Sequence, residues 1–75
     1  MSKDELEATL MLLGFTDIEP QRAWVHYSSG VDLVVRPPGL SENRWSTCTL
    51  IQDESVHSNF ATPSEVLEWV RENLR

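Results

Sequence analysis

Apolar and polar residues alternate over residues 22–36, RAWVHYSSGVDLVVR, and this pattern predicts a β-hairpin. A three-residue turn ending at Gly30, with the glycine in the left-handed conformation, places Tyr27 opposite Val31. Because side chains alternate across a strand, six residues then share one face, which we expect to be the core. These six are Ala23, Val25, Tyr27, Val31, Leu33 and Val35. The same register puts Trp24 on the other face, where polar residues would be expected.

A second hairpin is predicted over residues 44–52, RWSTCTLIQ, and 55–61, SVHSNFA, because both segments are rich in strand-forming residues. A tight turn at the acidic pair between them places Ile51 opposite Val56. This register predicts a core face with Trp45, Ile51, Val56 and Phe60, and an opposite face with Cys48, Leu50 and His57. Residues 37–43, PPGLSEN, are expected to form a surface loop, because two prolines do not fit the middle of a sheet.

The N-terminal segment predicts a helix that ends at Leu13. Ser2 is a good N-cap and Glu5 follows it by three residues, which is the spacing of a capping box. Gly14 can then adopt positive φ, and Phe15 can fold back on the last turn as in a Schellman motif.

The C-terminal segment predicts a second helix with the same kind of start. Thr62 is the N-cap, Pro63 occupies the first helical position and Glu65 completes a capping box. An apolar stripe at helical spacing follows, made of Val66, Leu67, Val70 and Leu74. The order α-β-β-β-β-α predicts an α+β fold. We expect one compact domain over residues 1–75, a two-layer sandwich in which an antiparallel four-stranded sheet carries both helices on one face.

The charge distribution narrows the choice of partners. Twelve acidic residues against six basic ones give a net charge of −6, and the acidic residues are concentrated towards the two ends of the chain. A direct phosphate contact needs a basic patch, so we expect neither nucleic acid nor an anionic membrane surface as a partner. The single cysteine cannot form an intramolecular disulfide, and the acidic N-terminus does not resemble a signal peptide, which favours a cytoplasmic location.

No catalytic, metal or cofactor motif is evident. The chain lacks a glycine-rich phosphate loop, a CxxC pair and an HxxxH pair, and 75 residues leave little room for an enclosed substrate cavity. His26, Cys48 and His57 are predicted to share the face opposite the core, where they could bind zinc or activate the thiol. A cysteine with bystander histidines is the commoner arrangement, so we predict a protein that is not an enzyme and has no cofactor.

Two helices cover only one face of a sheet, and the other face is predicted to bind a partner. Trp24, Val34 and Leu50 could form an apolar strip on this face, with Trp24 as the anchor. Arg22 and Arg36 would form its polar rim, and His26 is expected among the partner-binding residues of the same face. Alternatively, Trp24 is exposed without a role or is covered by a connecting loop.

A second possible interface consists of Met11, Leu12, Leu40 and Trp69. The first helix is apolar nearly all round, so Met11 and Leu12 either tuck under other elements or face a partner. Leu40 is an apolar residue in a polar loop. Trp69 lies on the flank of the apolar stripe, and it either packs at the edge of the core or is half exposed.

These observations predict a small acidic protein-binding module without enzymatic activity. A plausible specific form is an accessory or inhibitor protein, of the type encoded by phages or mobile elements, that acts on a host protein through the open sheet face. One alternative is an acidic mimic of nucleic acid that blocks a nucleic-acid-binding enzyme. Another is a structural homodimer joined through the first helix or a free strand edge.

Overall fold

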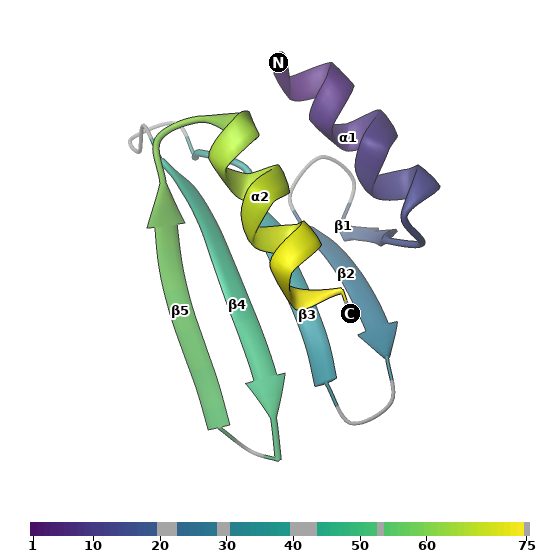
Figure 1. Ribbon diagram of the computed structural model, residues 1–75, viewed down its shortest axis with the longest axis vertical. Helices are drawn as coiled ribbons and strands as arrows, with labels where there is room; N and C mark the ends of the chain where they lie inside the picture. The colour runs from purple at the N-terminus through teal and green to yellow at the C-terminus, as the bar shows by residue number, and fades with distance from the viewer. Residues whose placement is uncertain (20–22, 29–30, 40–43, 53, 75) are drawn as a thin grey trace.

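The computed structural model describes residues 1–19, 23–28, 31–39, 44–52 and 54–74. Within these residues the elements are α1 (Lys3–Leu12), β1 (Thr16–Glu19), β2 (Ala23–Ser28), β3 (Val31–Arg36), β4 (Trp45–Ile51), β5 (Glu54–Phe60) and α2 (Pro63–Asn73). The strands form one antiparallel sheet in the order β1-β2-β3-β4-β5, so each strand pairs with its neighbours in the chain (Figure 1). The predicted α+β class is confirmed.

Within the described residues the sheet has five strands, so the prediction of four was wrong. The additional strand is β1, which the sequence suggested was part of a connector. It places Thr16 opposite Val25 and Asp17 opposite Trp24, and its register shifts before Glu19. A four-residue edge strand with an irregularity is too short to show an alternating pattern, and its pairing with β2 becomes visible only in the folded chain.

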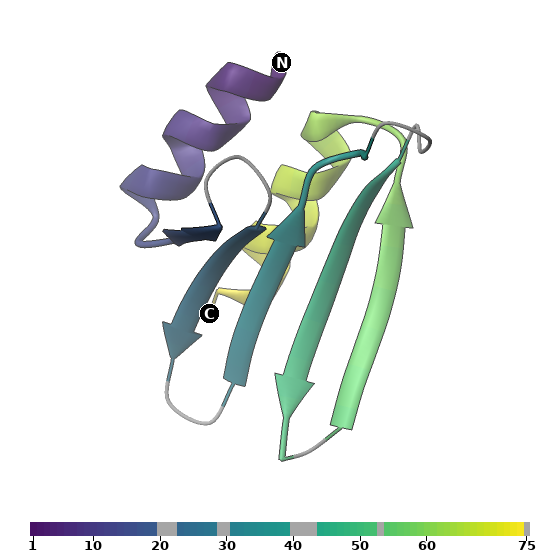
Figure 2. The ribbon, with the colours of Figure 1, turned by 180° about the vertical axis from the view of Figure 1, so that it is seen from behind.

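The two layers are the sheet and the pair of helices. α2 lies across β3, β4 and β5, and α1 packs against α2 near the β1 and β2 end of the sheet (Figure 1). Seen from behind, β3, β4 and β5 have no helix in front of them (Figure 2). We call this side of the sheet the open face.

Both helices begin as predicted. The Ser2 side chain accepts a hydrogen bond from the Glu5 backbone N–H at 3.2 Å, and the Thr62 hydroxyl accepts one from the Glu65 backbone N–H at 3.3 Å. Pro63 occupies the first helical position of α2. These bonds satisfy backbone donors that the first turn of a helix leaves free, which explains why local sequence predicts the helix starts.

The Schellman motif at the end of α1 is also confirmed. Gly14 has φ 98°, its N–H donates to the Met11 carbonyl at 3.1 Å, and the Phe15 N–H donates to the Leu10 carbonyl at 2.9 Å. This turn directs the chain from α1 into β1 and buries Phe15 in the core.

The core lies between the sheet and the helices. Its buried cluster is Leu6, Leu10, Phe15, Trp24, Leu33, Val35, Trp45, Val66, Leu67 and Val70. Leu74, at the end of the predicted stripe of α2, is half-buried and packs against this cluster. In the described part of the chain, neither helix has the length and apolar character needed to cross a bilayer.

The first hairpin has a different register from the predicted one. Trp24 pairs with Val35 and Tyr27 with Asp32, so the strands are shifted by one residue relative to the prediction. Ser28 pairs with Val31, which leaves two residues between the strands instead of three. A shift of one residue moves every side chain of a strand to the opposite face relative to its partner.

The second hairpin is shifted by two residues relative to its predicted register. Ile51 pairs with Glu54, and Thr49 pairs with Val56. Because a shift of two preserves the faces, the four residues assigned to the helix side do lie on that side. Ile51 and Val56 nevertheless remain 44% and 64% exposed, since these strands extend beyond α2 at their turn end (Figure 1). Their expected burial in the core was therefore wrong.

Candidate functional site

Neighbouring strands arrange the open face in three cross-strand rows. The first row holds Tyr27, Asp32, Leu50 and Ser55, the second Val25, Val34, Cys48 and His57, and the third Arg36, Ser46 and Asn59. The apolar side chains occupy the middle of the face, and polar side chains flank them on β5 and at the ends of β3. This is the distribution expected of a small protein interface with an apolar centre and a polar rim.

The open face is hollowed over β3, β4 and β5. The hollow has a volume of about 160 Å³ and is lined by Val34, Arg36, Ser46, Thr47, Cys48, Leu50 and His57. A cavity of about 150 Å³ holds a benzene ring, so the hollow matches one ring-sized or branched aliphatic side chain. Leu50 is 41% exposed, whereas Val34 and Cys48 are half-buried, so an entering group would meet an apolar floor.

The prediction placed Val34, Leu50 and Arg36 on this face, and the structure brings all three to the same hollow. Val34 lies beside Cys48 in the cross-strand register, and Leu50 lies two residues further along β4. Arg36 is exposed at the end of β3 and lies opposite Ser46.

Trp24 and His26 are on the other side of the sheet, so the expectation that they face a partner there was wrong. Trp24 is 5% exposed and belongs to the core cluster. The His26 ring is half-buried, lies 5.2 Å from the Phe15 ring and lies next to Gly14. The one-residue shift of the hairpin explains both placements, because burying the indole against the helices removes its large apolar surface from water. Arg22 lies outside the described residues.

The same shift brings Tyr27 to the open face, where the prediction did not place it. Its side chain is 65% exposed in the row of Leu50. Two-residue connections are the commonest in β-hairpins, and assuming one here would have given this register. Tyrosine is enriched at interface hot spots, because it combines an apolar ring with a hydroxyl.

Cys48 and His57 are close together in the hollow. The Cys48 Sγ lies 3.9 Å from the His57 Nε2, a contact between adjacent strands, and the Ser46 hydroxyl donates to the Asn59 side-chain oxygen at 3.3 Å. His26 lies across the sheet, so the three-residue set considered from the sequence does not assemble. Within the described ranges, no group of three or more His, Cys, Asp or Glu side chains is placed to hold a metal ion.

Three of the four residues of the second possible interface are described by the structure. Met11 and Leu12 are 63% and 88% exposed on α1, so the alternative in which they tuck under other elements is excluded. Trp69 is half-buried, packs against the core and lines a groove with Phe60 of β5. In Figure 1, β5 is the edge strand that lies far from α1. Leu40 lies outside the described residues.

Comparisons with models of protein families, with curated proteins and with solved structures found no significant match.

Proposed function

We propose that this protein is a binding module without enzymatic activity, and that its open face docks on another protein. The observation that carries the proposal is the apolar hollow of about 160 Å³ on a sheet face that no helix covers. Leu50 and Tyr27 are large side chains that remain 41% and 65% exposed there. Burying such side chains against a partner removes apolar surface from water, which is the main driving force of association.

The hollow also suggests the chemistry of the partner surface. Its volume fits one protruding side chain such as leucine or phenylalanine, and its floor offers Val34, Leu50 and Cys48 as contacts. Arg36 stands at the edge of the hollow, where its guanidinium can pair with an acidic residue of the partner. Among the described residues, Arg36 has no ion pair of its own.

Two adjacent residues provide a matched test. Leu50 and Ile51 are 41% and 44% exposed and point to opposite faces of β4. We expect Leu50→Asp to weaken partner binding at least tenfold, equivalent to about 1.4 kcal/mol, because the variant brings a charge into an apolar contact. Ile51→Asp introduces the same charge on the other face and should leave binding within about twofold.

The experiment begins with capture from an extract of the source cells on the wild type and both variants, at low and high salt. Circular dichroism establishes that each variant is folded. Affinity for the purified partner is then measured by calorimetry. Loss of the partner from Leu50→Asp alone, at both salt concentrations, supports the open face. Equal binding by all three proteins, or a loss limited to Ile51→Asp, contradicts it.

The two alternatives give different results in the same experiment. A homodimer would show twice the chain mass in light scattering of the pure protein, with dissociation in Leu50→Asp if the open face joins the copies. An acidic mimic of nucleic acid would hold its partner in all three proteins at low salt and lose it at high salt, because Coulombic attraction between exposed charges is screened. Either result contradicts docking of a different protein on the open face.

A further inference from the structure

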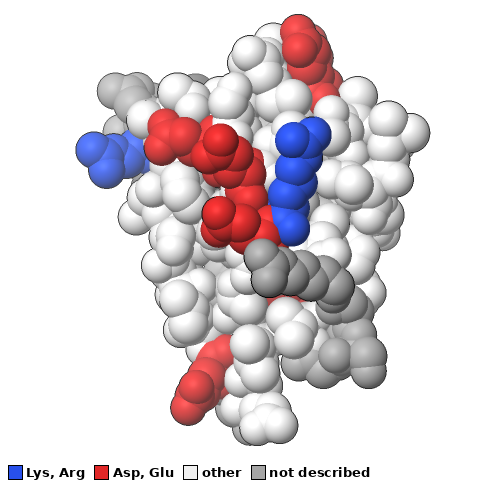
Figure 3. All heavy atoms as spheres, viewed as in Figure 1, with Lys and Arg blue, Asp and Glu red and all other residues white. Residues whose placement is uncertain are grey.

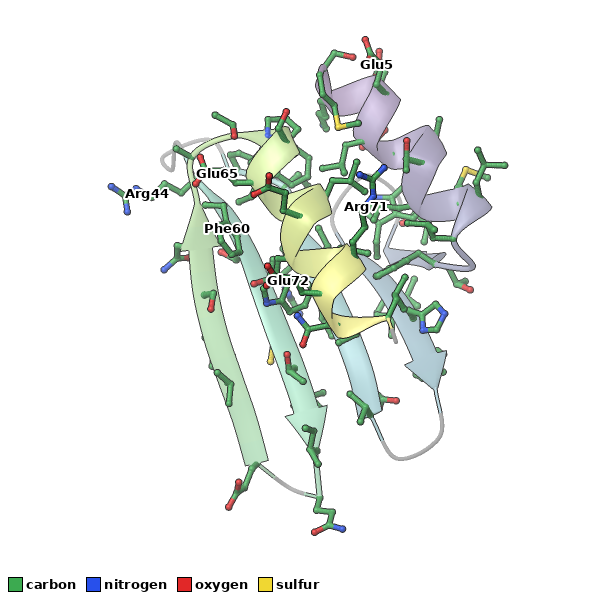
Figure 4. The ribbon with its side chains drawn as sticks, viewed as in Figure 1. Glu5, Arg44, Phe60, Glu65, Arg71 and Glu72 are labelled. Atoms are coloured by element: carbon green, nitrogen blue, oxygen red, sulfur yellow. The ribbon has the colours of Figure 1, made fainter. Side chains whose placement is uncertain are left out.

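A second surface, separate from the open face, lies between α2 and β5. It is a groove of about 170 Å³ lined by Phe60, Glu65, Glu68, Trp69 and Glu72. Phe60 and Trp69 are half-buried and pack against the core, so their rings form an aromatic floor. The three glutamates are exposed and provide the walls. We call this feature the acidic groove; Figure 4 labels Phe60, Glu65 and Glu72.

In the part of the chain that the structure describes, the carboxylates of the acidic groove form no ion pair. Acidic side chains gather over α2 in Figure 3, and the ion pair between Lys3 and Glu7 lies apart from them, on α1. Arg71 belongs to α2 but points towards α1 in Figure 4, and Arg44 points away from the helix.

The stability of α2 does not explain this arrangement. Glu65, Glu68 and Glu72 follow one another at spacings of three and four residues, so like charges adjoin along one side of the helix and repel each other. Glu65 benefits from the positive end of the helix dipole and from a hydrogen bond with the Thr62 hydroxyl at 3.1 Å. Glu72 lies near the C-terminal end, where the dipole opposes a negative charge. A ligand that neutralises these carboxylates would remove the repulsion between them and the unfavourable interaction of Glu72 with the helix dipole.

We infer that the acidic groove binds a cationic segment of a partner protein and receives its arginine or lysine side chains. A guanidinium or ammonium group can lie over the Trp69 or Phe60 ring while glutamate oxygens accept its N–H donors. The aromatic floor also provides contact for the aliphatic stem of the side chain. The acidic groove therefore matches both the charge and the apolar part of the same ligand.

Charge also decides between the possible occupants. A second copy of this chain carries a net charge of −6 and would bring its own carboxylates to the contact. Nucleic acid is repelled for the same reason. An apolar helix would have to desolvate three carboxylates without compensation. A basic segment is the occupant for which charge attraction and the burial of apolar surface both favour binding.

The test uses fluorescein-labelled hexa-arginine, titrated with the whole protein and followed by anisotropy. Glu68→Gln/Glu72→Gln removes two charges from the acidic groove. The matched control, Asp4→Asn/Glu54→Gln, removes two exposed charges elsewhere, at the start of α1 and the start of β5. We expect the Kd to rise at least fivefold in the first variant and to stay within about twofold in the second. An equal rise in both variants would mean attraction to net charge alone and would overturn the inference.

Two further readouts locate the binding. In NMR spectra of ¹⁵N-labelled protein, unlabelled hexa-arginine should shift the Trp69 indole N–H and the α2 amides around it. Shifts confined to α1 or to the open face would overturn the inference. Leu50→Asp changes the open face only and should bind hexa-arginine with the wild-type Kd. The proposal for the open face and the inference about the acidic groove can therefore be refuted separately. Light scattering that shows a dimer dissociated by Glu68→Gln/Glu72→Gln would assign the groove to a second copy instead.

Discussion

The hairpins β2–β3 and β4–β5 have the same antiparallel geometry, but the first is more deeply buried than the second. In β2, the three consecutive residues Ala23, Trp24 and Val25 are all at most 5% exposed, so this strand is buried on both faces. In β5, none of the seven residues is buried. The first hairpin lies inside the sheet, between β1 and β4, whereas the second ends the sheet with the free edge of β5.

Both hairpins contribute to the core, but the second lines more of the two surfaces that we propose for binding. The first hairpin supplies Trp24, Leu33 and Val35 to the core, and these contacts hold the domain together. The second hairpin supplies most of the lining of the hollow, and Phe60 to the acidic groove. Segments with few buried contacts are the ones in which surface residues can change without loss of the fold. We therefore expect substitutions in the two hairpins to affect different measurements.

The largest expected effect is that of Trp24→Ala. Truncating a buried aromatic residue costs about 3–5 kcal/mol of the free energy of unfolding, a large part of the total for a small domain. Tyr27→Ala is the matched control, because it truncates an aromatic residue of the same strand that is 65% exposed, and it should cost less than about 0.5 kcal/mol. Urea denaturation followed by circular dichroism measures both. Similar values for the two variants would contradict the observed register of β2.

A smaller effect is expected from two valines on the helix side of the sheet. Val35 is fully buried in β3, whereas Val56 is 64% exposed in β5. Val35→Ala should cost about 2 kcal/mol, from two lost methyl groups and the space they leave, and Val56→Ala less than about 0.5 kcal/mol. The same denaturation measurement tests the comparison between hairpins directly. A larger loss of unfolding free energy in Val56→Ala than in Val35→Ala would contradict the difference in burial between the two hairpins.

The smallest effect concerns the turn that brings β1 to the first hairpin. Gly14 has φ 98°, and a Cβ at this position would lie 3.4 Å from the His26 ring. Gly14→Ala should therefore cost about 1–2 kcal/mol, which is the usual penalty of left-handed backbone for an L-residue. Gly39→Ala serves as the control, because nothing lies within 4 Å of its added Cβ. The melting temperature from calorimetry should fall in the first variant only, and equal values would show that the turn tolerates a side chain.

The faces of the strands were predicted with different accuracy in the two hairpins. The faces of β3, β4 and β5 were predicted correctly, and they place Val34, Leu50 and Arg36 together on the open face. For β2 the faces were reversed. The error came from one residue in the assumed turn length, since a one-residue shift exchanges the faces and a two-residue shift preserves them.

The sequence by itself determined the features that depend on residues close together in the chain and on the pattern of apolar and polar positions. These are the helix caps at Ser2 and Thr62, the Schellman turn at Gly14, the existence of the two hairpins and the α+β class. The tertiary structure decided the pairing of β1 with β2, the burial of Trp24 and the assembly of the two candidate surfaces. The first of these joins neighbouring segments, but the other two depend on contacts between segments far apart in the chain, and there the burial of a large apolar side chain outweighs the weak preferences of a turn.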